Sequence, residues 1–278
     1  MKKLKIGLIQ MMCEKGEMAG NLKRMGKYLD EAEALDVEII AFPEMSITGY
    51  ADPTRDPNAI LRLDGDEVAT LRAMTAGRSF TVLAGLIEEN PQGKPFITQI
   101  VVRDGEMIGY YRKRTIEDEE LEWFSPGQDV PIFTHNELTF GLAICADIGY
   151  PDVFASCAAQ GADIVFELAA PGLYGAQATR DWATGYAWWE GDCRKKLGRY
   201  AQELGVWIAV ATQAGRTLDE DFPGGGFVFA PDGQRRFSTR DWQPGAVYLT
   251  LDLDEGTVRR ISAGFTGAGR IWQIKPTA

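Results

Sequence analysis

The chain has 278 residues, 45% of them hydrophobic, and a formal net charge of −11 at pH 7. Such a chain can bury a sizeable core, and because no Pro/Ser-rich linker interrupts its helical and strand patterns we expect a single domain over residues 1–278. The negative charge argues against nucleic acid and anionic membrane surfaces as partners.

Four cysteines and a single histidine limit the possible chemistry. The cysteines show neither a CxxC pair nor metal-ligand spacing, which is typical of free thiols in a reducing compartment. No stretch approaches the length of a transmembrane helix, and the amino terminus lacks a small-residue cleavage site, so we expect a cytoplasmic protein. His135 reads as part of a surface turn and receives no role. Histidine-dependent cysteine and serine hydrolases are therefore excluded, and so are most zinc hydrolases.

The first half of the chain alternates between strand and helix patterns. Helices are predicted over 66–76 and from Asn21, as N-cap, to about residue 35. The predicted strands lie at residues 5–11, 37–42, 80–87, 96–102 and 107–111. Glu44 and Lys113 each follow one of these strands, at a place where α/β proteins set catalytic groups. Taken alone, each could equally be an ordinary solvated residue.

Residues 115–126 form an acidic segment. Charge runs are usually solvated, but this one closes on Trp123 and Phe124 and a turn at Gly127. We therefore expect one of its carboxylates to point inward.

Residues 141–144 read as a buried strand that ends at Cys145. Pro151 can begin the next helix, over 152–160. A cysteine on a strand-to-helix turn has backbone N–H groups and a helix N-terminus nearby, and both favour a thiolate. A lone cysteine is more often an inert packing residue, so this stretch by itself leaves both roles open.

The second half of the chain predicts further strands and one long helix. Strands are predicted at residues 162–168, 206–211, on both sides of the Pro-Asp-Gly turn at 231–233, and at 247–253. The helix is predicted from Asp192, as N-cap, to Leu204, and is ended by Gly205. Aromatic residues between 170 and 191 could line a pocket, seal a subunit contact or belong to the core. About ten strands and four or five helices in this order indicate an α/β fold of mixed sheets covered by helices.

Three segments, each after a predicted strand, resemble the signature segments of the nitrilase superfamily (carbon–nitrogen hydrolases) in the same order. They are Phe42-Pro-Glu44, Tyr111-Arg-Lys113 and Ile144-Cys145-Ala-Asp147 with Pro151. Weaker resemblances extend the match over about residues 4–254, leaving a tail at 255–278. The resemblance implies a four-layer α-β-β-α sandwich. It also implies a homodimer, in which helices pack across the interface, or a higher homo-oligomer.

The resemblance also implies a catalytic triad of Glu44, Lys113 and Cys145. Glu44 would be the general base, first for the thiol and then for water. Cys145 would attack an amide or nitrile carbon and form a thioester. Lys113 and the backbone N–H of Ala146 would stabilise the charge that develops on oxygen.

A second glutamate is implied by the family pattern Glu-x-x-x-Phe-x-x-Gly. Glu120 fits this spacing and is expected to orient the lysine and the substrate amine, with Glu119 as the alternative. Tyr50 and Trp123 are the further residues expected to contact substrate. Loops around 50–56, 120–127 and 172–189 are expected to shape the pocket.

Three positions depart from the family pattern. Thr115 stands where a histidine is common, Gly149 where an arginine is often seen, and Asp152 where a glutamate is usual. None is a triad position, so we expect activity to survive. The departures remove one familiar pair of groups for a substrate carboxylate, although Arg180 or Arg194 could substitute.

The leading interpretation is a cofactor-free and metal-free hydrolase of a small linear amide or N-carbamoyl compound. A nitrilase, a non-catalytic scaffold and a redox-sensing thiol protein with Cys157 as resolving cysteine are the alternatives. A buried Lys-Glu-Cys cluster is costly to keep, which favours an enzyme over a scaffold.

Overall fold

The computed structural model describes residues 2–118 and 120–261, and its strands form two large sheets and one small one. The eight-stranded sheet has the spatial order β16 (Thr257–Arg260), β15 (Gly245–Asp252), β1 (Lys3–Gln10), β2 (Ile39–Ala41), β4 (Thr81–Glu88), β5 (Phe96–Arg103) and β6 (Glu106–Arg112), and β3 (Ile60–Leu61) pairs with β4. The six-stranded sheet has the order β14 (Arg235–Ser238), β13 (Gly226–Phe229), β10 (Trp207–Thr212), β9 (Ile164–Ala169), β8 (Leu138–Ile144) and β7 (Ile132–His135). A hairpin of β11 (Ala214–Arg216) and β12 (Asp221–Pro223) makes the third.

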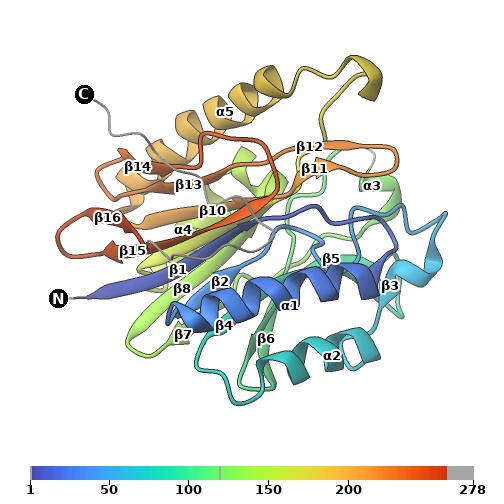
Figure 1. The fold of residues 1–278 in the computed structure, drawn as a ribbon, viewed down its shortest axis with the longest axis horizontal. Coiled ribbons are helices and arrows are strands. Elements are labelled where there is room, and N and C mark those ends of the chain that lie inside the picture. The colour runs from blue at the N-terminus through green and yellow to red at the C-terminus, as the bar shows by residue number, and fades with distance from the viewer. Residues whose placement is uncertain (1, 119, 262–278) are drawn as a thin grey trace.

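Helices cover the outer faces of the two large sheets (Figure 1). The α-helices are α1 (Met18–Ala34), α2 (Asp66–Thr75), α3 (Glu120–Trp123), α4 (Asp152–Ala159) and α5 (Trp182–Leu204), and 3₁₀ turns are η1 (Pro57–Ala59), η2 (Cys145–Gly149) and η3 (Gln177–Thr179). Helices α1 and α2 pack on the eight-stranded sheet, and α4 and α5 pack on the six-stranded sheet. The four-layer α-β-β-α sandwich predicted from the sequence is therefore confirmed.

Alternation along β4 explains why its sequence is continuously apolar. Val82 and Leu86 pack in the core beneath α1 and α2, whereas Leu83 and Ile87 belong to the core shared by the two sheets. A strand buried on both faces needs apolar side chains at every position. The same core receives Phe140 and other side chains from the six-stranded sheet, so it holds the two sheets face to face.

Two helices begin earlier than predicted. Helix α1 begins at Met18, and Asn21 lies buried inside it, where its amide donates to the carbonyls of Glu14 and Ile47 instead of capping the helix. Helix α5 begins at Trp182 with Asp181 as its N-cap, so Asp192 lies in mid-helix. Its predicted end at Gly205, in the left-handed conformation at φ 68°, is correct.

The predicted surface turn at His135 is also wrong. His135 is the last residue of β7, only 3% exposed, and its Nδ1 lies 2.8 Å from Thr81 Oγ1 on the other sheet. The turn begins one residue later, at Asn136, where φ is 52°. The described residues also contain sixteen strands where about ten were predicted, because strands of two to four residues at sheet edges have weak sequence signals.

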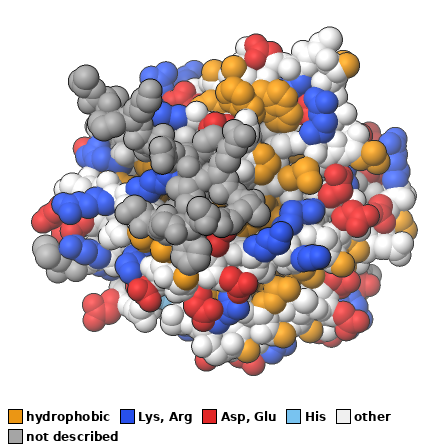
Figure 2. Space-filling view, in the orientation of Figure 1, with side chains coloured by type: hydrophobic (Ala, Val, Ile, Leu, Met, Phe, Trp, Pro, Cys, Tyr) orange, Lys and Arg blue, Asp and Glu red, His pale blue; other side chains and the backbone are white. Residues whose placement is uncertain are grey.

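Charge is mixed over the surface. On the face drawn in Figure 2, acidic and basic side chains are interspersed, so the net negative charge does not gather there into one acidic surface. Across residues 2–118 and 120–261 no helix is long and apolar enough to cross a membrane. In the same ranges no cluster of His, Cys, Asp and Glu has the arrangement of a metal site.

Candidate active site

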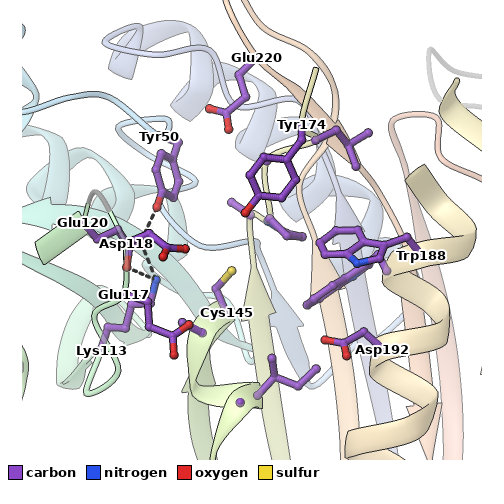
Figure 3. A pocket seen from close by; sticks show the side chains of 18 of the residues that line it. Tyr50, Lys113, Glu117, Asp118, Glu120, Cys145, Tyr174, Trp188, Asp192 and Glu220 are labelled. Atoms are coloured by element: carbon purple, nitrogen blue, oxygen red, sulfur yellow. Dashed lines mark hydrogen bonds and ion pairs between the residues drawn. The ribbon is translucent and has the colours of Figure 1, made fainter. Parts of the chain in front are cut away.

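A pocket of about 390 Å³ opens where strands of the two large sheets end. Cys145 follows β8 and Lys113 follows β6, and both side chains reach this pocket (Figure 3). Glu44 lies behind them in the turn after β2 and is fully buried. The structure thus brings together the three residues that were predicted to act together, from three separate strand ends.

The turn that presents Cys145 is held by a single carboxylate. Cys145 has a φ of 43°, a left-handed conformation that only a well-supported turn maintains in a non-glycine residue. Asp147 provides this support, because its carboxylate accepts hydrogen bonds from the Ile144 and Thr115 N–H groups and from the Tyr111 hydroxyl. Residue 115 therefore supports the turn through its backbone N–H, and this hydrogen bond can form whichever side chain stands there.

Lys113 is the centre of a buried ion cluster. Its ammonium lies 2.9 Å from Glu44 Oε1, 2.7 Å from Glu120 Oε1 and 2.9 Å from Glu120 Oε2. The second Glu44 oxygen accepts a hydrogen bond of 3.0 Å from the N–H of Ala170, which follows β9. Lys113 is 1% exposed and Glu44 is 0% exposed, so water screens these contacts little.

The cluster keeps a proton on the thiol and a positive charge on the lysine. Burial raises the pKa of the Cys145 thiol well above its ordinary value, and the Glu44 carboxylate raises it further against the opposing charge of Lys113. The surroundings of Cys145 therefore oppose the thiolate that the turn was expected to favour, so that attack by the sulfur needs a base. Burial also raises the pKa of Glu44 against the pull of Lys113, towards the range of a general base. For Lys113, burial alone would lower the pKa, but Glu44 and Glu120 raise it well above its ordinary value.

Glu120 is the carboxylate of the acidic segment that points inward, as predicted. It is 5% exposed and also accepts a hydrogen bond from the Tyr50 hydroxyl. The glycine of its motif has a clear reason: the N–H of Gly127 donates to the Lys113 carbonyl at 2.7 Å, and a Cβ there would lie 2.3 Å from the Arg112 carbonyl oxygen. The motif therefore holds Lys113 at two places: Glu120 binds its ammonium, and Gly127 binds its backbone carbonyl.

Of the other predicted site residues, some line the pocket and some do not. Ala146 and Tyr50 line the pocket. Trp123 does not line it, and packs at its ring edge against Phe124. Glu119 lies outside the described residues.

Neither arginine proposed as a carboxylate anchor lines the pocket. Arg180 is 9% exposed in its side chain, pairs with the buried carboxylate of Asp221 and donates to the carbonyls of Leu173 and Gly175. Arg194 lies on the exposed side of α5. That expectation is therefore wrong for both residues.

The pocket has a wall that the sequence analysis did not assign. Helix α5 contributes Trp188, Trp189, Asp192 and Lys196, and the preceding loop contributes Tyr174. The aromatic residues were recognised as candidates for a pocket or for core. Because α5 was predicted to begin at Asp192, their common helix face could not be seen.

The chain belongs to the carbon-nitrogen hydrolase family, whose model matches residues 5–260, and Cys145 sits at the position expected of the catalytic cysteine. This places it in the nitrilase superfamily, as the sequence motifs indicated.

Individual relatives differ in activity and length. The chain is 24% identical over 270 residues to a glutamine-dependent NAD(+) synthetase of Acinetobacter baylyi, covering 94% of this chain and 46% of that protein. It is 33% identical over 135 residues to a formamidase of Pseudomonas syringae pv. tomato, covering 48% of this chain and 40% of that one. The chain thus spans about half the length of the synthetases that it matches.

A solved structure shares the fold along nearly the whole chain. It is a mutant of the amidase from Nesterenkonia sp. AN1, showing covalent addition of the acetamide moiety of fluoroacetamide at its active-site cysteine. The TM-score is 0.76 at 21% identity, covering 91% of both chains.

Proposed function

We propose that this chain hydrolyses the carbon–nitrogen bond of a small linear amide or N-carbamoyl compound through a thioester on Cys145. The observation that carries the proposal is the Lys113 ammonium held between Glu44 and Glu120 beside the cysteine. Amidases among the relatives support the same class of reaction.

In the first half-reaction Glu44 takes the proton from the Cys145 thiol while the sulfur attacks the carbonyl carbon. The carbon–oxygen double bond opens to an oxyanion, which the Lys113 ammonium and the Ala146 N–H stabilise. When the double bond re-forms, the carbon–nitrogen bond breaks and the proton on Glu44 passes to the departing nitrogen. Ammonia or an amine leaves, and an acyl thioester remains.

In the second half-reaction Glu44 takes a proton from water, and the hydroxide adds to the thioester carbon. The same oxyanion contacts form again. The carbon–sulfur bond then breaks, and the proton on Glu44 returns to the sulfur. Amide plus water thus becomes carboxylic acid plus ammonia, with the cysteine restored. Glu120 keeps Lys113 in place throughout.

The proposal is tested by ammonia release from a panel of small amides, carbamoyl compounds and nitriles. Wild type should release ammonia from an amide or carbamoyl compound, and Cys145→Ala should not. Cys13→Ala is the matched control, because Cys13 is a buried cysteine outside the pocket. Hydroxylamine should divert part of the product to a hydroxamic acid, because it captures a thioester.

Three results would count against the proposal. Turnover of nitriles alone would make the chain a nitrilase. Turnover that survives Cys145→Ala would exclude a thioester on Cys145 as an intermediate. No turnover, with Cys145 no more reactive towards iodoacetamide than a free thiol, would favour a non-catalytic scaffold.

The redox-sensing alternative has little structural support. Cys157 lies on α4, fully buried, with its sulfur against Gly141 on the helix side of the six-stranded sheet. We further propose that residues 1–278 act as one domain and as a cytoplasmic homodimer, which light scattering of the purified chain and cell fractionation would test.

A further inference from the structure

The pocket around Cys145 is lined by more acidic than basic side chains. Apart from Lys113 and Glu120, its charged lining residues in the described part of the chain are Glu117, Asp118, Asp192, Lys196 and Glu220. Four of these are acids and one is a base, and one of the acids, Glu220, is paired with Lys15 at 3.0 Å. The imbalance is local, because charges of both signs are interspersed on the surface drawn in Figure 2.

The single base is not available to an anionic substrate. Lys196 pairs with Asp192 one helical turn away, at 2.9 Å. No arginine lines the pocket in the described ranges, since Arg180 is held by Asp221 and by backbone carbonyls. A carboxylate entering the pocket would therefore meet uncompensated negative charge.

Two acids at the entrance have no cationic partner. Glu117 and Asp118 are exposed, follow Lys113 closely in sequence, and make no ion pair within the described residues. Figure 3 shows them on one side of Cys145, while Asp192 and Trp188 lie on the other. A positive charge held between these walls would face the two unpaired acids on one side, whereas Asp192 on the other side is already paired with Lys196.

Aromatic rings add a second and independent feature. Trp188 is 47% exposed and Tyr174 is 84% exposed, and both line the pocket above Cys145 (Figure 3). The faces of such rings carry partial negative charge and attract ammonium and guanidinium groups. Exposed aromatic rings on one wall and the unpaired carboxylates of Glu117 and Asp118 on the other are a combination that can hold an organic cation.

We propose that the substrate is an amide or carbamoyl compound whose far end carries a positive charge, an ammonium or a guanidinium. This inference rests on the proposed function and names its substrate class. The amide carbon lies at Cys145, and the cationic end lies between the Glu117–Asp118 side and the Trp188 ring.

The first test compares three amides of matched length but different charge: 4-aminobutanamide, pentanamide and succinamate. We expect kcat/KM to fall in that order, by about tenfold or more from the cationic to the anionic compound, since each exposed charge contributes about two- to fivefold. The preference should weaken as salt is raised from about 0.02 to about 0.5 M, because the Debye length then falls from about 20 Å to about 4 Å. A preference for pentanamide or succinamate would overturn the proposal.

The variant Glu117→Gln/Asp118→Asn tests which residues set the preference. Asn suits the left-handed φ of 48° at Asp118. The ratio of cationic to neutral turnover should fall about four- to twenty-five-fold, since two charges are removed. Glu122→Gln is the matched control, because Glu122 is an exposed acid of the same segment that does not line the pocket, and it should leave the ratio unchanged. An equal effect of both variants would overturn the assignment.

A second measurement needs no turnover. The thiol of Cys145 reacts with a methanethiosulfonate, forming a mixed disulfide and releasing methanesulfinate, and the other three cysteines are buried. Relative to a small free thiol, the 2-aminoethyl reagent should modify Cys145 about tenfold faster than the 2-sulfonatoethyl reagent, and Trp188→Leu should reduce this ratio about two- to fivefold. A ratio near one overturns the inference even if amides are hydrolysed. A high ratio without amide turnover supports the cation site while the proposed function fails.

Discussion

Replacement of Lys113 by methionine tests whether the buried cluster is held by charge. The ammonium makes contacts of 2.7 to 2.9 Å to Glu44 and Glu120. At an effective dielectric constant of about 20, one such contact has a Coulomb energy of about 6 kcal/mol. Desolvation of the three ions offsets most of this gain, but removing one partner leaves two buried carboxylates unpaired, at a cost of about 3–5 kcal/mol.

The loss should depend on pH in a defined direction. Without Lys113, burial and the neighbouring Glu120 charge raise the pKa of Glu44 in the folded state above the value of about 4.3 in the unfolded chain. A carboxyl group with a raised folded-state pKa is tolerated while protonated and opposes folding once pH exceeds the unfolded-state pKa. The destabilisation of Lys113→Met should therefore be smallest near pH 5 and grow towards pH 8.

Urea unfolding of wild type and variant at pH 5, 6.5 and 8 measures this difference. Lys113→Met combined with Glu44→Gln and Glu120→Gln is the control, because it removes both charges and should lose the pH dependence. A destabilisation below about 1 kcal/mol, the worth of an exposed pair, would refute the reasoning. So would a loss that stays constant with pH.

Three further predictions concern the surroundings of the triad. Because burial raises the pKa of Glu44, kcat/KM should decline with falling pH nearer to neutrality than an ordinary glutamate would allow, and a profile flat down to pH 4 would contradict this. Gly85→Ala should lower the free energy of unfolding in urea by about 1–3 kcal/mol and reduce kcat/KM, because its Cβ would lie 2.3 Å from the N atom of Met45. Unchanged kinetics would show that the turn can shift freely. Asp147→Asn should cost about 1–3 kcal/mol by weakening its three hydrogen bonds, and should slow Cys145 alkylation, whereas an unaltered alkylation rate would separate this carboxylate from the nucleophile turn.

The triad was predicted from the resemblance of three segments to one family, and local signals added only the position of each residue after a strand. Glu44, Lys113 and Cys145 each follow a short strand whose apolar pattern and ending are visible within a few residues. The strands themselves are not neighbours: β2 and β6 are separated by β4 and β5 in the eight-stranded sheet, and β8 lies in the six-stranded sheet. The meeting of the three residues therefore depends on how the two sheets stack. Glu120 was found by spacing to Phe124 and Gly127, and the hydrogen bond from Gly127 to Lys113 explains that spacing.

The pocket wall formed by α5 could not be predicted, because tertiary contacts hold residues 182–191 in a helix that their local propensity disfavours. Gly185 and Gly191 disfavour a helix by about 1 kcal/mol each relative to alanine, which hid the start at Trp182. Burial of Trp189 and its hydrogen bond to Thr212 of β10 outweigh that cost. The burial of His135 likewise depends on Thr81, a residue of the opposite sheet. Contacts between distant segments leave no pattern in a single sequence.

The origin of the triad in two different sheets has a consequence for how activity is lost. Glu44 and Lys113 follow strands of the eight-stranded sheet, whereas Cys145 and the N–H of Ala170 follow strands of the six-stranded sheet. A few hydrogen bonds cross between the layers at this place, among them those from the Ala170 N–H to Glu44 and from the Tyr111 hydroxyl and the Thr115 N–H to Asp147. The rest of the contact is apolar packing, which has no directional bonds to resist a small slide. A small shift of one sheet relative to the other therefore changes the distance between Glu44 and Cys145. On warming, hydrolysis should fade while both hydrogen-bonded ladders are still intact, so inactivation precedes any change in the circular dichroism spectrum.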